Sequence, residues 1–206
     1  MKNKIIKKVA AISFIIGLLN TKNIFAESEV YTVKFGDTLW KIAQKYQVGV
    51  SEIIDANSQF KDPHLIYPGD KVTIPLVDAE TKSIEQEILD LVNQERIEDG
   101  LPALTLNWEL SRVARYKSQD MCDKNYFNHN SPTYGSPFDM LKKFNIDYRS
   151  AGENIAKGQK TARAVMNSWM NSSGHRANIL NRNFKELGVG YYKKDGATYW
   201  TQLFIK

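Results

Sequence analysis

The run NSWMNSSGHRANIL, residues 167–180, decides how the C-terminal part of the chain is interpreted. It places His175 directly after a Ser-Ser-Gly segment and ahead of a helical turn. Two polar runs precede it: AGENIAKG contains Glu153, and FNHNSP contains His129. Two imidazoles and one carboxylate either form a site or support irregular backbone, because buried polar groups need partners in both cases. The surrounding sequence sets the fold in which they lie.

The sequence on both sides of this run predicts an α+β domain over residues 84–206. Apolar residues recur at helical spacing in four segments: SIEQEILDLVNQERIEDG, NWELSRVARYKSQDMCDKNYF, SPFDMLKKF and TARAVMNSWM. Ser136 followed by Pro137 is a typical helix start. The run ELGVGYYKKDGATYWTQLFIK places Lys194-Asp195-Gly196 between two strand-like segments, which predicts a hairpin. Helices combined with a hairpin favour a layered α+β architecture.

A second, smaller unit precedes this domain, over residues 30–75. VYTV is typical of a short strand, and GDTLWKIAQKY has helical spacing with Asp37 or Thr38 as the N-cap. SEIIDAN predicts a second helix capped by Ser51, and KVTIP predicts a second strand that ends at Pro75. The expected order is therefore strand, helix, helix, strand.

Residues 30–75 closely resemble the LysM module, through the runs YTVKFGDTLWKIAQKY and LIYPGDKVTIP. The resemblance implies binding to glycans that contain N-acetylglucosamine, such as peptidoglycan or a chitin-like polymer. It places the glycan contacts in two short segments: Gly36, Asp37 and Thr38, and Leu65, Ile66, Tyr67 and Pro68. Small polar and backbone groups beside an apolar wall suit a sugar. Turn formation and core packing account equally well for several of these residues.

The C-terminal domain resembles bacterial CAP domains, also called SCP-like domains. FNHNSP, AGENIA, SWMNSSGHRANIL, LGVGYY and YWTQLF occur in the order found in that family and span residues 85–205. The resemblance implies an α-β-α sandwich with a cleft, in which His129, Glu153 and His175 match the cleft residues. Many relatives from animals, fungi and plants carry a second glutamate after the tryptophan of the fourth helix. Here no acidic residue lies between Glu153 and Glu186.

These three cleft residues are compatible with several kinds of chemistry. None of the three residues is assigned a catalytic role. Two neutral imidazoles and a carboxylate match the ligand set of a zinc ion with one open position, which makes His129, Glu153 and His175 tentative zinc ligands. A hydrolytic zinc also needs a separate base, and no H-E-x-x-H run is present. The serines near the histidines are explained by turns and caps. The trio is equally well read as polar scaffolding, with Asn154 and Asn178 bracing the backbone.

Residues 1–26 are predicted to be a secretory signal peptide. MKNKIIKK is basic, VAAISFIIGLL is apolar, and NTKNIFA ends in a small residue, so we expect cleavage after Ala26. The apolar part is short for a bilayer span, although an uncleaved anchor is the alternative. Five of the 28 basic residues lie in this leader, which leaves 23 basic against 23 acidic residues in the mature chain. This balance does not favour a nucleic-acid partner.

The sequence therefore predicts a signal peptide (1–26), a LysM glycan-binding module (27–76), a short linker (77–83) and a CAP domain (84–206). Cys122 is the single cysteine, so no intramolecular disulfide forms and noncovalent binding must hold the protein at the wall. We expect a secreted, cell-wall-associated protein, with no membrane span after signal cleavage, that binds peptidoglycan. Its CAP domain is expected to be a non-enzymatic binding or assembly module with an envelope or spore-layer protein as partner. The alternatives are a cell-wall hydrolase or protease that uses the cleft, and a site for a small apolar ligand.

Overall fold

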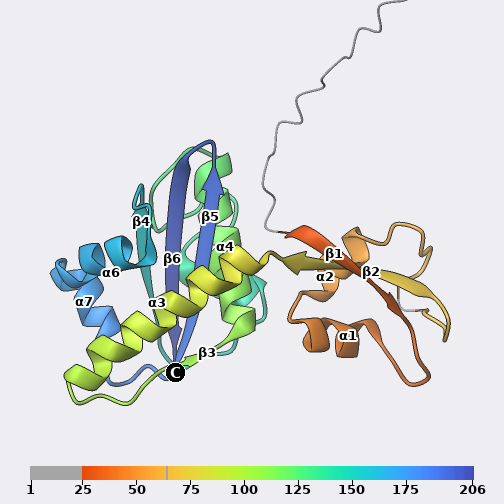
Figure 1. The fold of residues 1–206 in the computed structure, drawn as a ribbon, viewed down its shortest axis with the longest axis horizontal. Helices are drawn as coiled ribbons and strands as arrows, with labels where there is room; N and C mark the ends of the chain where they lie inside the picture. Colours follow the sequence, from red (N-terminus) through yellow and green to blue (C-terminus); the bar gives the residue numbers. More distant parts are fainter. Residues whose placement is uncertain (1–24, 64) are drawn as a thin grey trace, which may run out of the picture.

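The computed structural model describes residues 25–63 and 65–206 of the 206-residue chain. The predicted signal peptide, residues 1–26, therefore lies outside the described residues except at its last two positions. No helix within the described ranges is long and apolar enough to cross a membrane. The described chain forms a smaller N-terminal unit and a larger C-terminal unit that lie side by side (Figure 1).

The smaller unit has the predicted order of elements. Strands β1 (Phe25–Thr32) and β2 (Lys71–Val77) pair in an antiparallel sheet. Helices α1 (Leu39–Tyr46) and α2 (Val50–Asp55) come between these strands in the sequence. Figure 1 shows both helices on the same side of the two-stranded sheet.

Of the two helix N-caps predicted for this unit, one is confirmed and the other is wrong. Thr38 caps α1, because its Oγ1 accepts a hydrogen bond from the backbone N–H of Lys41 at 3.2 Å. The cap predicted at Ser51 is wrong, since α2 begins at Val50 and its N-cap is Gly49, two residues before Ser51. The Ser51 hydroxyl instead donates to Glu52 Oε2 at 2.8 Å.

The apolar residues predicted to lie at helical and strand spacing form the core of this unit. Its members are Val33, Leu39, Ile42, Ala43, Val48, Ile53, Val72 and Ile74. Asn57 is buried beside them and satisfies backbone groups of two elements, donating to the carbonyls of Ile53 (2.6 Å) and Thr73 (2.7 Å). Asn57 thus ties the end of α2 to β2 and helps a small core to hold together.

The stretch predicted as a linker, residues 77–83, has regular secondary structure. Val77 ends β2, and Asp78 caps α3 (Ala79–Glu98) by accepting from the backbone N–H of Thr81 at 2.8 Å. One residue therefore separates the last strand of the smaller unit from the first helix of the larger one. This short passage restricts how the two units can move relative to each other.

The larger unit contains a four-stranded mixed sheet. The strand order is β3-β5-β6-β4, with β3 (Thr105–Leu106), β4 (Ala151–Lys157), β5 (Glu186–Lys194) and β6 (Ala197–Ile205). The predicted hairpin joins β5 to β6, and Asp195 and Gly196 both have positive φ, 50° and 78°, as a type I′ turn requires.

Helices cover both faces of this sheet and give the expected α-β-α sandwich. On one face, α4 (Trp108–Asp123) and α5 (Pro137–Lys143) pack their apolar residues against Leu203 and Ile205. On the other face, α3, α6 (Ala162–Met170) and α7 (Ser173–Ile179) pack with the alternate residues of β5 and β6. Trp169, Trp200 and Phe204 lie fully buried in this second layer.

Two glycines on β5 allow α4 to approach the sheet closely. A Cβ at Gly188 would lie 2.4 Å from the backbone carbon of Leu110, and one at Gly190 would lie 2.1 Å from that of Ala114. Both contacts involve backbone atoms, so a side chain at either position would push the helix away. The two glycines in the run LGVGYY are thus explained by the close packing of α4 on β5.

A buried ion pair joins the two units. Arg112 on α4 contacts Glu52 on α2, with Nε 2.5 Å from Oε1 and Nη2 2.9 Å from Oε2. Tyr116 OH donates to the same carboxylate at 2.8 Å. Val77 and Tyr192 form a small apolar cluster at another part of the contact, with Phe25 against it.

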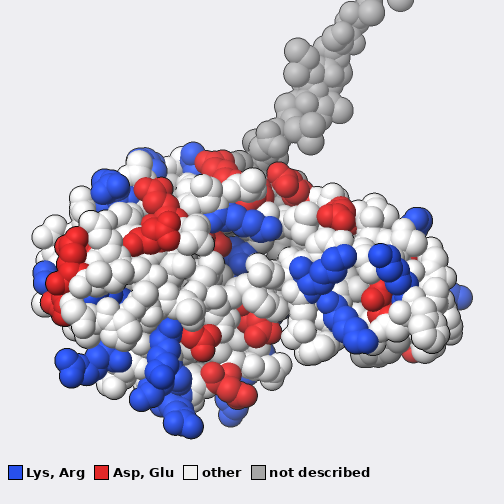
Figure 2. Space-filling view, turned by 60° about the horizontal axis from the view of Figure 1, so that its bottom comes forward, with Lys and Arg blue, Asp and Glu red and all other residues white. Residues whose placement is uncertain are grey.

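Lys, Arg, Asp and Glu residues are interspersed on the face of the larger unit shown in Figure 2. This distribution agrees with the equal numbers of basic and acidic residues, 23 of each, after residue 26.

Candidate functional site

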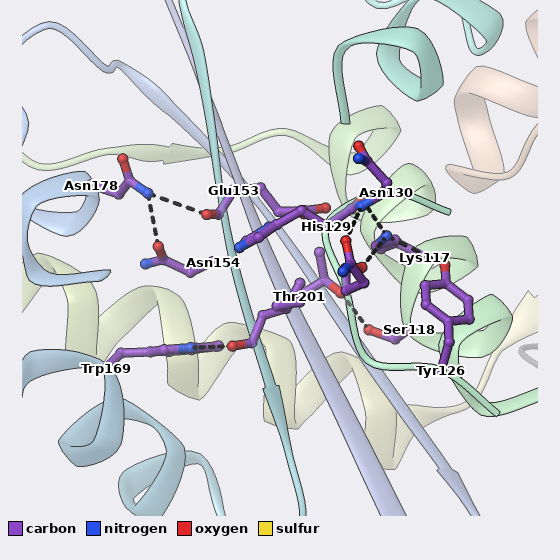
Figure 3. Close-up of polar contacts among 12 residues, drawn as sticks. Lys117, Ser118, Tyr126, His129, Asn130, Glu153, Asn154, Trp169, Asn178 and Thr201 are labelled. Carbon is purple, nitrogen blue, oxygen red and sulfur yellow. Dashed lines mark hydrogen bonds and ion pairs between the residues drawn. The ribbon is translucent and has the colours of Figure 1, made fainter. Parts of the chain in front are cut away.

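The three predicted cleft residues come from three elements that meet at one end of the larger unit. His129 lies in the loop between α4 and α5, Glu153 lies on β4, and His175 lies on α7. His129 Nδ1 is 2.6 Å from Glu153 Oε1, and Figure 3 shows the two side chains pointing toward each other. The carboxylate is buried, with its side chain 3% exposed, whereas the His129 side chain is 53% exposed. The pair thus joins a buried carboxyl group to a half-exposed imidazole.

A buried lysine fixes the loop that carries His129. The Lys117 ammonium donates to the backbone carbonyls of Asn128 at 2.8 Å and His129 at 2.6 Å. Burial lowers the pKa of Lys117, although the nearby Glu153 and Asp120 carboxylates act in the opposite direction. Lys117 therefore sets the position of the His129 backbone and places a positive charge near Glu153.

Asp120 holds the rest of the same loop. Its carboxylate accepts hydrogen bonds from Ser131 Oγ at 2.6 Å, Thr133 Oγ1 at 2.5 Å and Tyr126 OH at 2.6 Å. The Ser131 hydroxyl is thereby directed to Asp120 and not to His129. Among the described residues, no serine hydroxyl is hydrogen bonded to His129 or His175, so the structure contains no assembled serine–histidine pair.

Two asparagines connect β4 to α7 beneath the site. Asn178 Nδ2 donates to the Glu153 carbonyl at 3.2 Å and to Asn154 Oδ1 at 2.9 Å (Figure 3). Asn154 Nδ2 in turn donates to the His175 carbonyl at 3.1 Å and to Gln202 Oε1 at 3.0 Å. These contacts are of the bracing kind expected for Asn154 and Asn178. They fix the backbone on both sides of the cleft.

His175 lies near the pair and remains uncharged at neutral pH. Burial lowers the pKa of its imidazole below the ordinary 6.5, and the charge of His129 lowers it further. Within residues 25–63 and 65–206, however, no group of three or more His, Cys, Asp or Glu side chains is arranged to hold a metal ion. His129, Glu153 and His175 are therefore not arranged as three ligands of one zinc ion in this structure.

A pocket of about 220 Å³ opens beside Glu153 and His129. Most of its wall is apolar and comes from Pro137, Phe138, Leu141, Ala151 and Leu203. Glu153 Oε2 is buried and has no hydrogen-bond partner among the described residues. The site therefore combines a His–Glu pair with an adjoining apolar wall, as many ligand pockets do.

The residues that support the site were less visible in the sequence than His129, Glu153 and His175. Lys117 and Asp120 lie on an amphipathic helix, where charged residues ordinarily face solvent. Their sequence signal was weak, since each acts on backbone or hydroxyl groups six or more residues away. Phe138 follows the predicted helix start but gave no indication of lining a pocket.

The predicted glycan-binding segments lie next to each other at the far end of the smaller unit. Val33 accepts a hydrogen bond from the Gly69 N–H and donates to the Asp70 carbonyl, each at 2.9 Å. These bonds join the loop that carries Gly36, Asp37 and Thr38 to the one that carries Leu65, Ile66, Tyr67 and Pro68.

Each loop is shaped by its own polar contacts. Asp37 accepts from the Lys34 N–H and from Tyr31 OH, both at 2.8 Å, and Gly36 has the positive φ (83°) that the turn requires. Asp70 closes the second loop by accepting from the Tyr67 N–H at 2.8 Å. Leu65 and Tyr67 remain exposed at 56% and 62%, whereas Ile66 packs against the core.

Large apolar side chains are exposed at this end of the smaller unit. Besides Leu65 and Tyr67, they include Phe35 at 96% and Trp40 at 60%, which the sequence did not single out. Exposed apolar side chains grouped in this way are typical of a surface that binds a ligand or a partner.

The fold and the site define a two-part protein, a small β-α-α-β module followed by an α-β-α sandwich. The sequence profile of the cysteine-rich secretory protein family, CAP, matches residues 89–204, and that of the LysM domain matches residues 31–75. The chain therefore belongs to the CAP family and carries a LysM domain ahead of the CAP domain.

Three similar proteins illustrate these matches. The uncharacterized protein YkwD of Bacillus subtilis (strain 168) is 56% identical over 127 residues, which cover 62% of this chain and 49% of YkwD. The crystal structure of an extracellular protein containing a SCP domain from Bacillus anthracis str. Ames has 38% identity and a TM-score of 0.58, and the match covers 68% of this chain and 47% of that one. Spore coat assembly protein ExsA of Bacillus cereus is 45% identical over 47 residues, 23% of this chain and 7% of ExsA. This chain spans about half the length of the curated relatives that it matches most extensively.

Proposed function

We propose that this protein is an exported cell-envelope protein that binds peptidoglycan through its LysM domain. The observation that carries the proposal is the pair of joined loops with exposed Leu65 and Tyr67 beside the turn at Gly36. This surface offers backbone polar groups and apolar faces together, which is the combination that a glycan requires. A single shallow LysM site binds weakly, so retention at the wall depends on the many repeats of the polymer.

Deletion of the LysM domain tests this proposal in cells. Without residues 27–76, the protein should be released into the medium instead of remaining in the wall fraction. Deletion also removes Glu52 from Arg112, so circular dichroism of the truncated protein must first show that the CAP domain is folded. A folded CAP domain that stays in the wall fraction as well as the whole protein does would refute the assignment.

We propose further that the CAP domain acts as a binding or assembly module without enzymatic activity. Glu153 is the buried carboxylate of the cleft, and no second acidic residue accompanies it between positions 153 and 186. Acid–base hydrolysis often uses two carboxyl groups with separated pKa values, whereas Glu153 is the single carboxyl group among the described residues that line this pocket. The LysM match to a protein named for spore coat assembly supports a spore-layer or wall-layer role with a protein partner.

Hydrolysis of peptidoglycan or protein is the second candidate, and the His129–Glu153 contact favours it. An imidazole oriented by a carboxylate at 2.6 Å can serve as a general base. Zymography on peptidoglycan and proteolysis assays with the purified protein distinguish the two proposals. Activity that disappears in Glu153→Gln would establish the hydrolase, whereas no activity in the parent protein supports the binding module.

A further inference from the structure

A second hollow lies where the LysM and CAP domains meet, away from the CAP cleft. Its volume is about 200 Å³. Both domains contribute apolar walls: Val48 and Val77 come from the LysM side, and Leu106 and Trp108 come from the CAP side. Arg115 of α4 and Lys82 of α3 also line it. The hollow therefore exists only where the two domains are in contact.

Arg115 presents unused hydrogen-bond donors to this hollow. Its side chain is only 7% exposed, and its Nε lies 3.3 Å from both the Ser111 carbonyl and Glu85 Oε1. Neither Nη atom has a hydrogen-bond partner among the residues that the structure describes. Both Nη atoms are open to solvent, because neither is among the buried side-chain atoms without a partner in the described chain. The free side of the fork is therefore available to a molecule in the hollow.

Glu85 neutralises Arg115 only in part. Burial raises the pKa of Glu85 to about 7, although the charge of Arg115 opposes this effect. Glu85 Oε1 makes no hydrogen bond, so its 3.3 Å contact with Arg115 is a loose one. Lys82, an exposed residue at the edge, adds a second positive charge. The hollow is therefore lined by two basic side chains, Arg115 and Lys82, and by one carboxyl group, Glu85.

We propose that this interdomain hollow binds a carboxylate carried on a small body, such as one sugar ring or the last residues of a peptide. The two Nη donors of Arg115 match the two oxygens of a carboxylate in a planar, bidentate arrangement. Lys82 attracts the same anion, and the body of the ligand packs against Trp108 and Val48. Because the walls come from both domains, the bound ligand also stabilises their contact.

Two sources of this chemistry are separated by the choice of probe. The capped dipeptide N-acetyl-D-Ala-D-Ala carries a peptide carboxylate, and glucuronic acid carries a sugar carboxylate; their neutral counterparts are N-acetyl-D-Ala-D-Ala amide and glucose. Each is titrated into the whole protein while the backbone amides of Lys82, Gln86 and Ser111 are followed by NMR. We expect saturable shifts with at least one carboxylate probe and none with its neutral counterpart. Equal shifts with the neutral probes, or no shifts with any probe, overturn the proposal.

Matched variants locate the site. Arg115→Lys keeps the charge but loses the fork, so the affinity should fall by about tenfold or more. Lys82→Glu reverses an exposed charge at the hollow and should weaken binding severalfold without affecting the fold. Lys124→Glu is the control, because Lys124 is also exposed but is the C-cap of α4 and does not line the hollow. If Arg115→Lys does not fold, the Lys82 and Lys124 pair decides, and equal affinities for these two variants overturn the proposal.

Discussion

Replacement of Arg112 with methionine should loosen the LysM domain from the CAP domain while leaving each domain folded. Arg112 supplies two hydrogen bonds to Glu52, and the Glu52 side chain is only 4% exposed. Burial alone raises the pKa of Glu52, yet the arginine, Tyr116 and Ser51 together bring it below its ordinary value. Methionine fills a similar volume but leaves the carboxylate without its counter-charge.

The structure predicts unequal costs for the two halves of this ion pair. Removal of one partner from a buried pair costs about 3 kcal/mol or more, because the remaining charge is buried without compensation. Arg112→Met leaves the more buried group, Glu52, so we expect about 3 kcal/mol of lost domain-contact free energy. Glu52→Gln leaves Arg112, which is 18% exposed and can reach water, so its cost should be about 1 kcal/mol.

Urea unfolding followed by NMR measures both effects, since amide signals report on each domain separately. In Arg112→Met, the LysM signals should disappear at a lower urea concentration than in the parent protein, and the CAP signals should change less. Arg163→Met is the matched control, because Arg163 is exposed on α6, far from the contact. Identical LysM midpoints in the parent, Arg112→Met and Glu52→Gln would refute the proposed role of this pair.

Three further predictions follow from the titratable groups. Burial raises the pKa of Glu85 from 4.5 to about 7, so its contribution to the free energy of unfolding should fall by about 3 kcal/mol as the pH rises between these values. Urea unfolding at pH 5 and pH 7.5 measures this change, and Glu85→Gln should remove it. An unchanged pH dependence in Glu85→Gln would contradict the assignment. The pKa of His175, measured by NMR, should lie below 6.5 and should rise toward 6.5 in His129→Gln. Neutral His175 contributes to stability above pH 6.5, and this contribution is lost as the pH falls through the lowered pKa. A pKa at or above 6.5 in the parent protein would argue against burial of this imidazole. In zinc titrations at pH 7.5, the His175→Ala variant should bind zinc no more weakly than the parent protein, because the described chain has no group of three metal ligands. If the parent binds zinc tightly, and this binding is lost both in His175→Ala and at pH 5.5, the zinc site would be established.

Much of the fold could be predicted because local signals and tertiary structure agree. Thr38 caps α1, Ser136 forms a capping box with Asp139, and Asp195-Gly196 makes the hairpin turn. Strand β4 gave no strand signal, because AGENIAK contains few β-branched residues and does not alternate between polar and apolar. The start of α3 at Ala79 was also missed, since its first turn is polar and depends on the cap at Asp78.

Sequence motifs indicated the main residues of the candidate site, but they did not indicate which of these residues contact each other. Sequence motifs indicated His129, Glu153 and His175, whereas only the structure shows that the first two pair directly. Contacts such as Glu52 with Arg112 join residues 60 positions apart. Both residues lie at polar helical positions, which the periodic pattern of apolar residues assigns to solvent. Local sequence patterns therefore could not predict that they are in contact.

Co-sedimentation with purified, insoluble peptidoglycan tests the central claim most directly. The variant Tyr67→Ala with Leu65→Ala removes two exposed side chains from the proposed glycan surface and no side-chain hydrogen bond between described residues. Tyr148→Ala, an exposed position on the CAP domain, is the matched control. We predict that the parent and Tyr148→Ala sediment with the polymer and that the double variant remains largely in the supernatant. Sedimentation of the double variant to the same extent as the parent would contradict glycan binding by this surface.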